Sequence, residues 1–128
     1  MEGIGPTYAA SLKQAGIYTA DKLLEIGLDR NGRITLAEKT LSNETSILKW
    51  VNMCDLFRIK GVAGQYAELL EGAGVDTVKE LRTRNAENLV EKMAEVNKAK
   101  HLCKVVPGLK ATSNWIEQAK QLPPVVSY

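Results

Sequence analysis

The amino-acid sequence repeats itself at a distance of 58 residues, and this repeat limits the possible folds more than any other feature. The segment that begins Gly3-Ile4-Gly5 returns 58 positions later as the segment that begins Gly61-Val62-Ala63. The same spacing pairs Leu12 with Leu70, Gly16 with Gly74, Thr19 with Thr77, and Leu23 with Leu81. The matched residues are mostly glycines, threonines and aliphatic residues, which determine backbone conformation and core packing. The sequence therefore predicts two copies of one structural unit.

Each copy begins with the pattern of two short helices. After a tight glycine turn, apolar residues at positions 8, 12 and 15, and again at 66, 70 and 73, are spaced four and three apart. This spacing puts them on one face of a helix. Gly16 and Gly74 then stand where a residue with positive φ commonly ends a helix. Thr19 and Thr77 are suited to cap the next helix, because their hydroxyl oxygens accept hydrogen bonds from its first N–H groups.

The remainder of the first copy predicts two further helical stretches. Asp29–Gly32 has the composition of a turn, and residues 33–41 are weakly helical. Asn43 is expected to cap a longer helix that reaches Phe57.

The second copy predicts two helices of similar kind, and no segment alternates with period two for long enough to form a strand. Asn85 is expected to cap a helix that runs to about Cys103, and Thr112 or Ser113 to start the last helix. We expect this last helix to pack beside Ile4 and Tyr8, so that the two copies close around a pseudo-two-fold axis.

The totals indicate a single globular domain. The chain has 128 residues, of which 45% are hydrophobic and 25% charged, close to the globular average. We expect an all-α fold with one unit at residues 1–57 and a second at 58–128. No apolar run is long enough for a membrane span, and no secretory signal opens the chain. Cys54 and Cys103 are interpreted as buried small residues, which favours a reducing, cytoplasmic location.

Several stretches of the chain are similar to a known family. Gly3–Ala9 and Gly61–Ala67 resemble the glycine turns of the helix-hairpin-helix superfamily. Together with other stretches, the chain more closely resembles the family of small prokaryotic proteins catalogued as domain of unknown function 4332. These stretches are residues 32–33, 36–40, 47–52, 55–61, 74–81, 84–85, 87–89, 95–97, 115–116 and 118–120. The resemblance covers nearly the whole chain and implies two tandem helix-hairpin-helix (SAM-like) units packed as one domain.

The wider superfamily is associated with DNA binding that does not read base sequence, and the resemblance implies two such sites here. A glycine turn lets two backbones approach closely, and the helix that follows points N–H groups and its positive dipole end at a phosphate. Carried over by position, the first site comprises Gly3, Ile4, Gly5, Thr7 and Lys13. The second site comprises Arg58, Lys60, Gly61, Ala63, Gly64 and Gln65. An alternative interpretation is that both turns only connect helices.

A group of lysines near the second turn extends this candidate site. Residues 58–128 hold eleven Lys/Arg and eight Asp/Glu, whereas residues 1–57 hold six and seven. No acidic residue lies between Glu95 and Glu117, while four lysines lie there: Lys98, Lys100, Lys104 and Lys110. These lysines are either a solvated helix face or a patch that faces phosphate.

The sequence departs from the DNA-binding pattern at several positions. Ala63 replaces the second glycine of the second turn, and Thr7 and Gln65 stand where strong binders often have a basic residue. Glu2, Glu68 and Glu71 lie close to the turns and repel phosphate. Each departure weakens the electrostatic attraction that dominates non-specific binding.

No set of residues suitable for catalysis is present, so we do not expect an enzyme. On a continuous helix His101 and Cys103 would not face each other, because residues two apart point in different directions. We expect no metal, cofactor or small-molecule substrate. Two hypotheses remain: a module that binds the backbone of DNA or RNA, and a protein-interaction or scaffold module with no nucleic-acid role.

Overall fold

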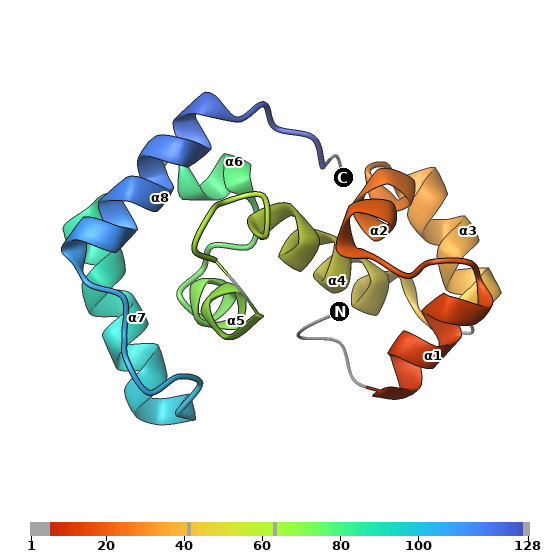
Figure 1. The fold of residues 1–128 in the computed structure, drawn as a ribbon, viewed down its shortest axis with the longest axis horizontal. Coiled ribbons are helices and arrows are strands. Elements are labelled where there is room, and N and C mark those ends of the chain that lie inside the picture. Colours follow the sequence, from red (N-terminus) through yellow and green to blue (C-terminus); the bar gives the residue numbers. More distant parts are fainter. Residues whose placement is uncertain (1–5, 41, 63, 127–128) are drawn as a thin grey trace. The chain divides into compact units, whose positions relative to one another are not determined.

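The computed structural model describes residues 6–40, 42–62 and 64–126, and of residues 6–9 it describes the backbone alone. Within these ranges the chain forms eight helices, α1 to α8, and no strand (Figure 1). The all-α prediction is therefore confirmed.

The chain divides into two compact units. One comprises Met1–Asp55 with Val125–Tyr128, and the other comprises Leu56–Pro124. In the structure the division thus falls within the last turn of α4 (Glu44–Leu56), and the end of the chain belongs to the first unit.

The first unit contains four helices around one core. They are α1 (Pro6–Gln14), α2 (Ala20–Gly27), α3 (Arg30–Thr40) and α4 (Glu44–Leu56). Its core consists of buried apolar residues from all four helices and from the α1–α2 connection: Leu12, Ile17, Leu23, Leu36, Ala37, Ile47, Trp50, Val51 and Cys54. Val126, near the end of the chain, packs against the same core.

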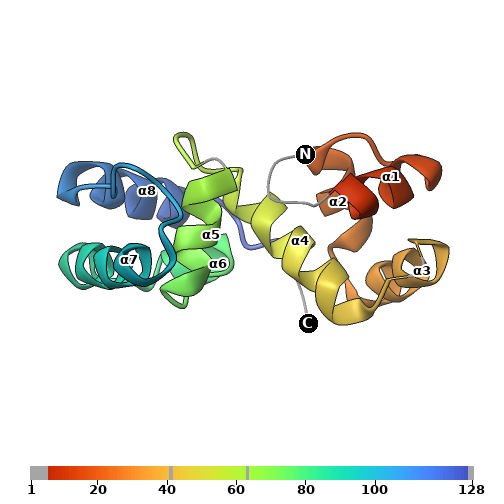
Figure 2. The same cartoon turned by 90° about the horizontal axis from the view of Figure 1, so that it is seen from below.

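The second unit also contains four helices. They are α5 (Gly64–Gly72), α6 (Val78–Leu81), α7 (Ala86–Lys100) and α8 (Leu109–Gln121). Helices α7 and α8 lie side by side, α5 packs against α7, and α6 packs against α8 (Figures 1 and 2). Leu70, Met93, Trp115, Ile116 and Ala119 are among the residues buried in this unit.

The repeat is visible in the backbone of both units. After α1, Ile17 N–H donates to Leu12 O at 2.8 Å, and Gly16 has a φ of 84°. After α5, 58 residues later, Val75 N–H donates to Leu70 O at 2.8 Å, and Gly74 has a φ of 91°. Because this 6→1 hydrogen bond requires a left-handed residue, the two glycines end their helices as predicted.

The predicted helix caps are also present. The hydroxyl oxygens of Thr19 and Thr77 accept from N–H groups three residues later, both at 3.2 Å. Asn85 caps α7 by accepting from Asn88 N–H at 3.1 Å. Asn43 caps α4, because its side-chain oxygen accepts from Ser46 N–H at 2.8 Å.

The predicted turn at Asp29–Gly32 is wrong. Arg30 begins α3, and the Asp29 carboxylate accepts from Gly32 N–H at 2.7 Å. The Asp-Arg-Asn-Gly composition therefore marks a capped helix start.

Two predicted helix ends in the second unit are also wrong. Helix α8 begins at Leu109, with Gly108 as its cap and no side-chain cap bond, so Thr112 lies inside the helix and is fully buried. Helix α7 ends at Lys100, because His101 takes a left-handed conformation with a φ of 52°. Cys103 is consequently a half-buried loop residue.

The last helix belongs to the second unit. It packs against α6 and α7 and contacts the turn that precedes α5. The prediction that it lies beside Ile4 and Tyr8 concerns residues whose side chains are outside the described part of the chain.

No helix in the described part of the chain is both long and apolar enough to cross a membrane.

Candidate functional site

The α4–α5 connection, which we define as residues 57–63, contains the second of the two predicted glycine turns. Ile59 N–H donates to Leu56 O at 3.1 Å, and Val62 N–H donates to Ile59 O at 3.2 Å. Gly61 has a φ of 98°, a conformation that other residues rarely adopt. The side chains of Ile59 and Val62 are buried, so the connection is anchored to the core of the second unit.

Gln118 of α8 fixes this connection from the side. Lys60 N–H donates to Gln118 Oε1 at 2.8 Å, and Gln118 Nε2 donates back to Lys60 O at 3.1 Å. The amide groups of Lys60 and Val62 are therefore used inside the protein. A phosphate at this site would have to be met by the first turn of α5 and by neighbouring side chains.

The first turn of α5 lines one side of an open pocket of about 600 Å³ in the second unit. The pocket is lined by residues of this turn and of the α7–α8 connection: Gln65, Tyr66, His101, Leu102, Cys103, Lys104 and Val105. The first turn of α5 has no acidic residue. The N–H groups at the start of a helix have no partner within the helix and form the positive end of its dipole.

The α7–α8 connection is held in place by hydrogen bonds on both sides of the pocket. His101 N–H donates to Asn97 O at 2.8 Å, which ends α7. The Asn97 side chain then accepts from Cys103 N–H at 2.9 Å and donates to Cys103 O at 3.0 Å. From the α5 side, the Tyr66 hydroxyl donates to Val105 O at 3.2 Å.

Lys104 is the one Lys, Arg, Asp or Glu residue among those that line the pocket. Lys104 and His101 are exposed, and none of the residues that line the pocket is acidic. Glu68, half-buried on α5, is close in sequence but does not line the pocket. An ammonium, an imidazole N–H and a helix N-terminus can each bind an oxyanion. Phosphate is a common ligand of such groups.

The structure brings together two of the residues predicted from sequence, Gln65 and Lys104, which lie 39 positions apart. Lys98 and Lys100 are exposed in the last turn of α7 and do not line the pocket. The Arg58 guanidinium donates to Pro123 O at 2.9 Å, so it stabilises the chain after α8. Gly64, the first residue of α5, is buried.

The first predicted site lies largely outside the described residues. Gly3, Ile4 and Gly5 are not described, nor are the Thr7 side chain and, in the second site, Ala63. Lys13 is described, and it is an exposed residue in the last turn of α1.

Sequence reasoning missed five of the residues that line the pocket: Tyr66, His101, Leu102, Cys103 and Val105. The four loop residues lie near Gln65 because α7 ends three residues earlier than predicted and the loop turns back toward α5. The available signal was Pro107-Gly108, which marks the loop but not the residue at which α7 ends.

A metal centre is not indicated in the described part of the chain. There, no three His, Cys, Asp or Glu residues lie close enough together to hold an ion.

The fold and the pocket define an all-helical protein with an open pocket that one lysine and several polar side chains line beside the first turn of α5. Comparison with protein families places the chain more closely: residues 2–122 match the model of a Domain of unknown function (DUF4332), so the chain belongs to this family. Neither a curated protein nor a solved structure matches the chain.

Proposed function

We propose that this protein is a non-enzymatic module that binds the phosphate backbone of DNA or RNA without reading its base sequence. The observation that carries the proposal is the pocket at the start of α5, where Gln65, His101 and Lys104 meet with no carboxylate among the lining residues. Backbone binding depends on such cations and N–H groups, and no groove-reading element is needed.

We further propose that each unit contains a helix-hairpin-helix. The recurrence of the glycine stop and the threonine cap 58 residues apart supports this architecture. The positive φ of Gly61 and the start of α5 three residues later also fit such a hairpin. A reducing, cytoplasmic location fits the two free cysteines.

The expected affinity is low. Few cations lie near the pocket, Glu68 lowers the local potential, and Lys60 N–H is already bound to Gln118. We expect Kd values in the micromolar range at low salt and a shallow dependence of affinity on salt, because few counterions are released.

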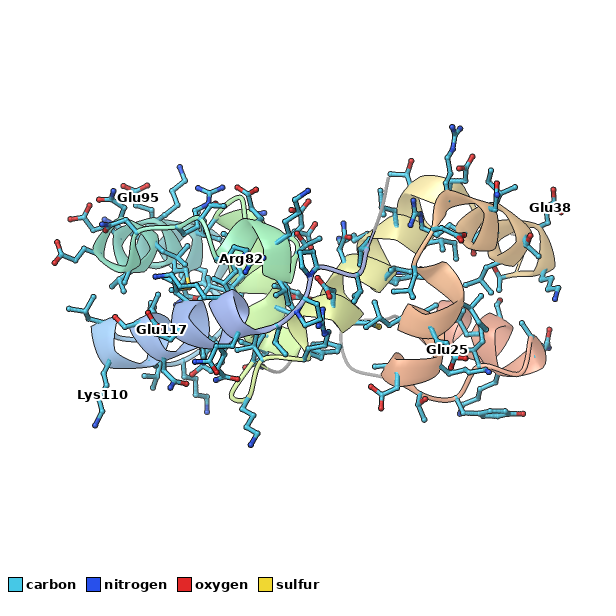
Figure 3. The ribbon with its side chains drawn as sticks, turned by 90° about the horizontal axis from the view of Figure 1, so that it is seen from above. Glu25, Glu38, Arg82, Glu95, Lys110 and Glu117 are labelled. Atoms are coloured by element: carbon cyan, nitrogen blue, oxygen red, sulfur yellow. The ribbon has the colours of Figure 1, made fainter. Side chains whose placement is uncertain are left out.

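The test is a fluorescence-anisotropy titration of the whole chain with generic single-stranded and duplex DNA at low salt. Lys104→Glu places a negative charge at the pocket and should weaken binding roughly tenfold, which corresponds to about 1.4 kcal/mol. Lys110→Glu is the matched control, because Lys110 is exposed at the start of α8, where its side chain extends into solvent (Figure 3), and it does not line the pocket.

Equal weakening by both variants would mean that only total charge matters. Absence of binding at low salt would contradict the proposal.

The alternative function, a protein-interaction or scaffold module, is favoured by two exposed apolar side chains on the α7–α8 connection and the start of α8. Val105 is 70% exposed and Leu109 is 49% exposed. This function predicts no DNA binding under the conditions above, so the same titration separates the two.

A further inference from the structure

We propose that the pocket receives the terminal nucleotide of a strand that ends in a phosphate monoester; this inference rests on the proposed function and specifies its ligand. The pocket differs from a simple backbone groove in its volume, its lining and its place in the repeat.

The volume fits a single nucleotide better than an isolated phosphate. At about 600 Å³, it lies within the range of roughly 300–1,000 Å³ in which proteins hold small organic ligands. A phosphate group alone would leave most of this space to water.

The lining has the two kinds of surface that a nucleotide requires. Gln65, His101 and Lys104 offer polar hydrogen-bond donors, whereas Tyr66, Leu102 and Val105 offer apolar and aromatic surface. The Tyr66 ring is fixed, because its centroid lies 5.5 Å from that of Trp115 and its hydroxyl is bound to Val105 O. A fixed aromatic side chain suits contact with any base, since every base has a π-face.

The charge of the lining favours a strand end over an internal phosphate. An internal phosphodiester carries one negative charge, whereas a phosphate monoester carries about −1.5 to −2 at pH 7. The Lys104 ammonium, with no acidic residue beside it in the lining, therefore gains more from the monoester.

The pocket depends on a segment that the first unit lacks. Residues 41–43 connect α3 to α4, whereas residues 101–108 connect α7 to α8, and five of these eight residues line the pocket. The pocket is therefore an addition to the second copy and not a general product of the repeat.

The experiment compares four unlabelled thymidine oligonucleotides of equal length as competitors of an internally labelled strand. The first carries a 5′-phosphate, the second carries a 3′-phosphate, and the third has hydroxyl groups at both ends. The fourth is circular and therefore has no strand end. We expect at least one phosphorylated strand to compete roughly fivefold better than the hydroxyl-ended and circular strands, and the two phosphorylated arms identify which end is bound.

The variant Val105→Glu adds a carboxylate at the pocket, and Val105→Gln is its neutral control. Because the Val105 side chain is 70% exposed and only its carbonyl accepts from Tyr66, both variants should fold. Val105→Glu should abolish the preference for the phosphorylated strand, and Val105→Gln should retain it.

Equal competition by all four strands would overturn the inference and leave backbone binding intact. A phosphate preference that Val105→Glu does not reduce would also overturn it, because the preference would then arise elsewhere. If no strand binds at low salt, the proposed function fails as well.

Discussion

The indole nitrogen of Trp115 lies 3.0 Å from the point that a Cβ atom would occupy on Gly61. Gly61 also has a φ of 98°, so its lack of a side chain serves both the turn and the approach of α8. Trp115 is only 4% exposed and packs against Tyr66, which leaves the indole little room to move. The α4–α5 connection and the last helix are thus fitted to each other at this glycine.

Replacing Gly61 should therefore destabilise the protein. Gly61→Ala imposes backbone strain and a close contact with Trp115, and we expect a loss of about 1–3 kcal/mol in the free energy of unfolding. Urea denaturation followed by tryptophan fluorescence measures this loss. Gly16→Ala is the matched control, because Gly16 has a φ of 84° but no heavy atom within 4 Å of its Cβ position. Equal losses in both variants would show that the contact with Trp115 costs nothing.

The threonine cap of α6 provides a second prediction. Thr77 Oγ1 accepts from Glu80 N–H at 3.2 Å, and the side chain is buried. Thr77→Ala removes this acceptor and should lower the free energy of unfolding by about 0.5–2 kcal/mol, whereas Thr77→Ser keeps the hydroxyl and should recover most of the loss. Thermal unfolding by circular dichroism measures both, and a Ser variant as unstable as the Ala variant would contradict the capping role.

The local features of this fold could be predicted from the sequence because each depends on residues close together in the chain. Gly16 and Gly74 follow an apolar 3–4 pattern, and Thr19 and Thr77 stand three residues before the N–H groups that they cap. The start of α8 could not be predicted in this way, because its cap, Gly108, has no side-chain acceptor. The first residue of a type that commonly caps a helix is Thr112, which lies one turn inside α8.

The candidate site was only partly predictable, because it depends on contacts between distant residues. Gln65 and Lys104 were identified separately, one from the glycine turn and the other from a stretch without acids. Their proximity depends on the left-handed conformation of His101, which is uncommon for residues other than glycine although histidine adopts it more often than most, and the sequence does not single out His101 for it. The Gln118–Lys60 pair, 58 residues apart, likewise leaves no local pattern.

The Asn97 side chain should prove necessary for the shape of the pocket. It makes two hydrogen bonds to the Cys103 backbone, and each such bond contributes about 0.5–1.5 kcal/mol. We expect Asn97→Ala to lower the free energy of unfolding by about 1–3 kcal/mol and to speed hydrogen exchange at the Cys103 amide. Asn88→Ala is the control, because Asn88 is an exposed residue of the same helix. Unchanged exchange at Cys103 in Asn97→Ala would show that the loop is held by other contacts.

The two cysteines should differ in reactivity. Cys54 is 3% exposed in the core of the first unit, whereas Cys103 is half-buried and lines the pocket. Burial, with a smaller contribution from the negative charge of Asp21, raises the pKa of Cys54 from 9.0 to about 12. Brief treatment of the folded protein with iodoacetamide at pH 8 should therefore modify Cys103 alone, and should modify no thiol in Cys103→Ser. Mass spectrometry counts the modified thiols. Modification of Cys54 at the same rate as Cys103 would contradict its burial.

The raised pKa of Cys54 also predicts how stability changes at alkaline pH. The unfolded chain releases the Cys54 proton near pH 9.0, but the folded chain keeps it until about pH 12. Between these values the folded state holds more protons, so the contribution of Cys54 to stability is complete below pH 9.0 and declines as the pH rises. The thermal midpoint of the native protein should therefore fall more steeply between pH 9 and 10.5 than that of Cys54→Ala, which lacks the thiol. Both proteins share every other group that titrates in this range, so parallel curves would show that the Cys54 thiol is not held in its neutral form by the core.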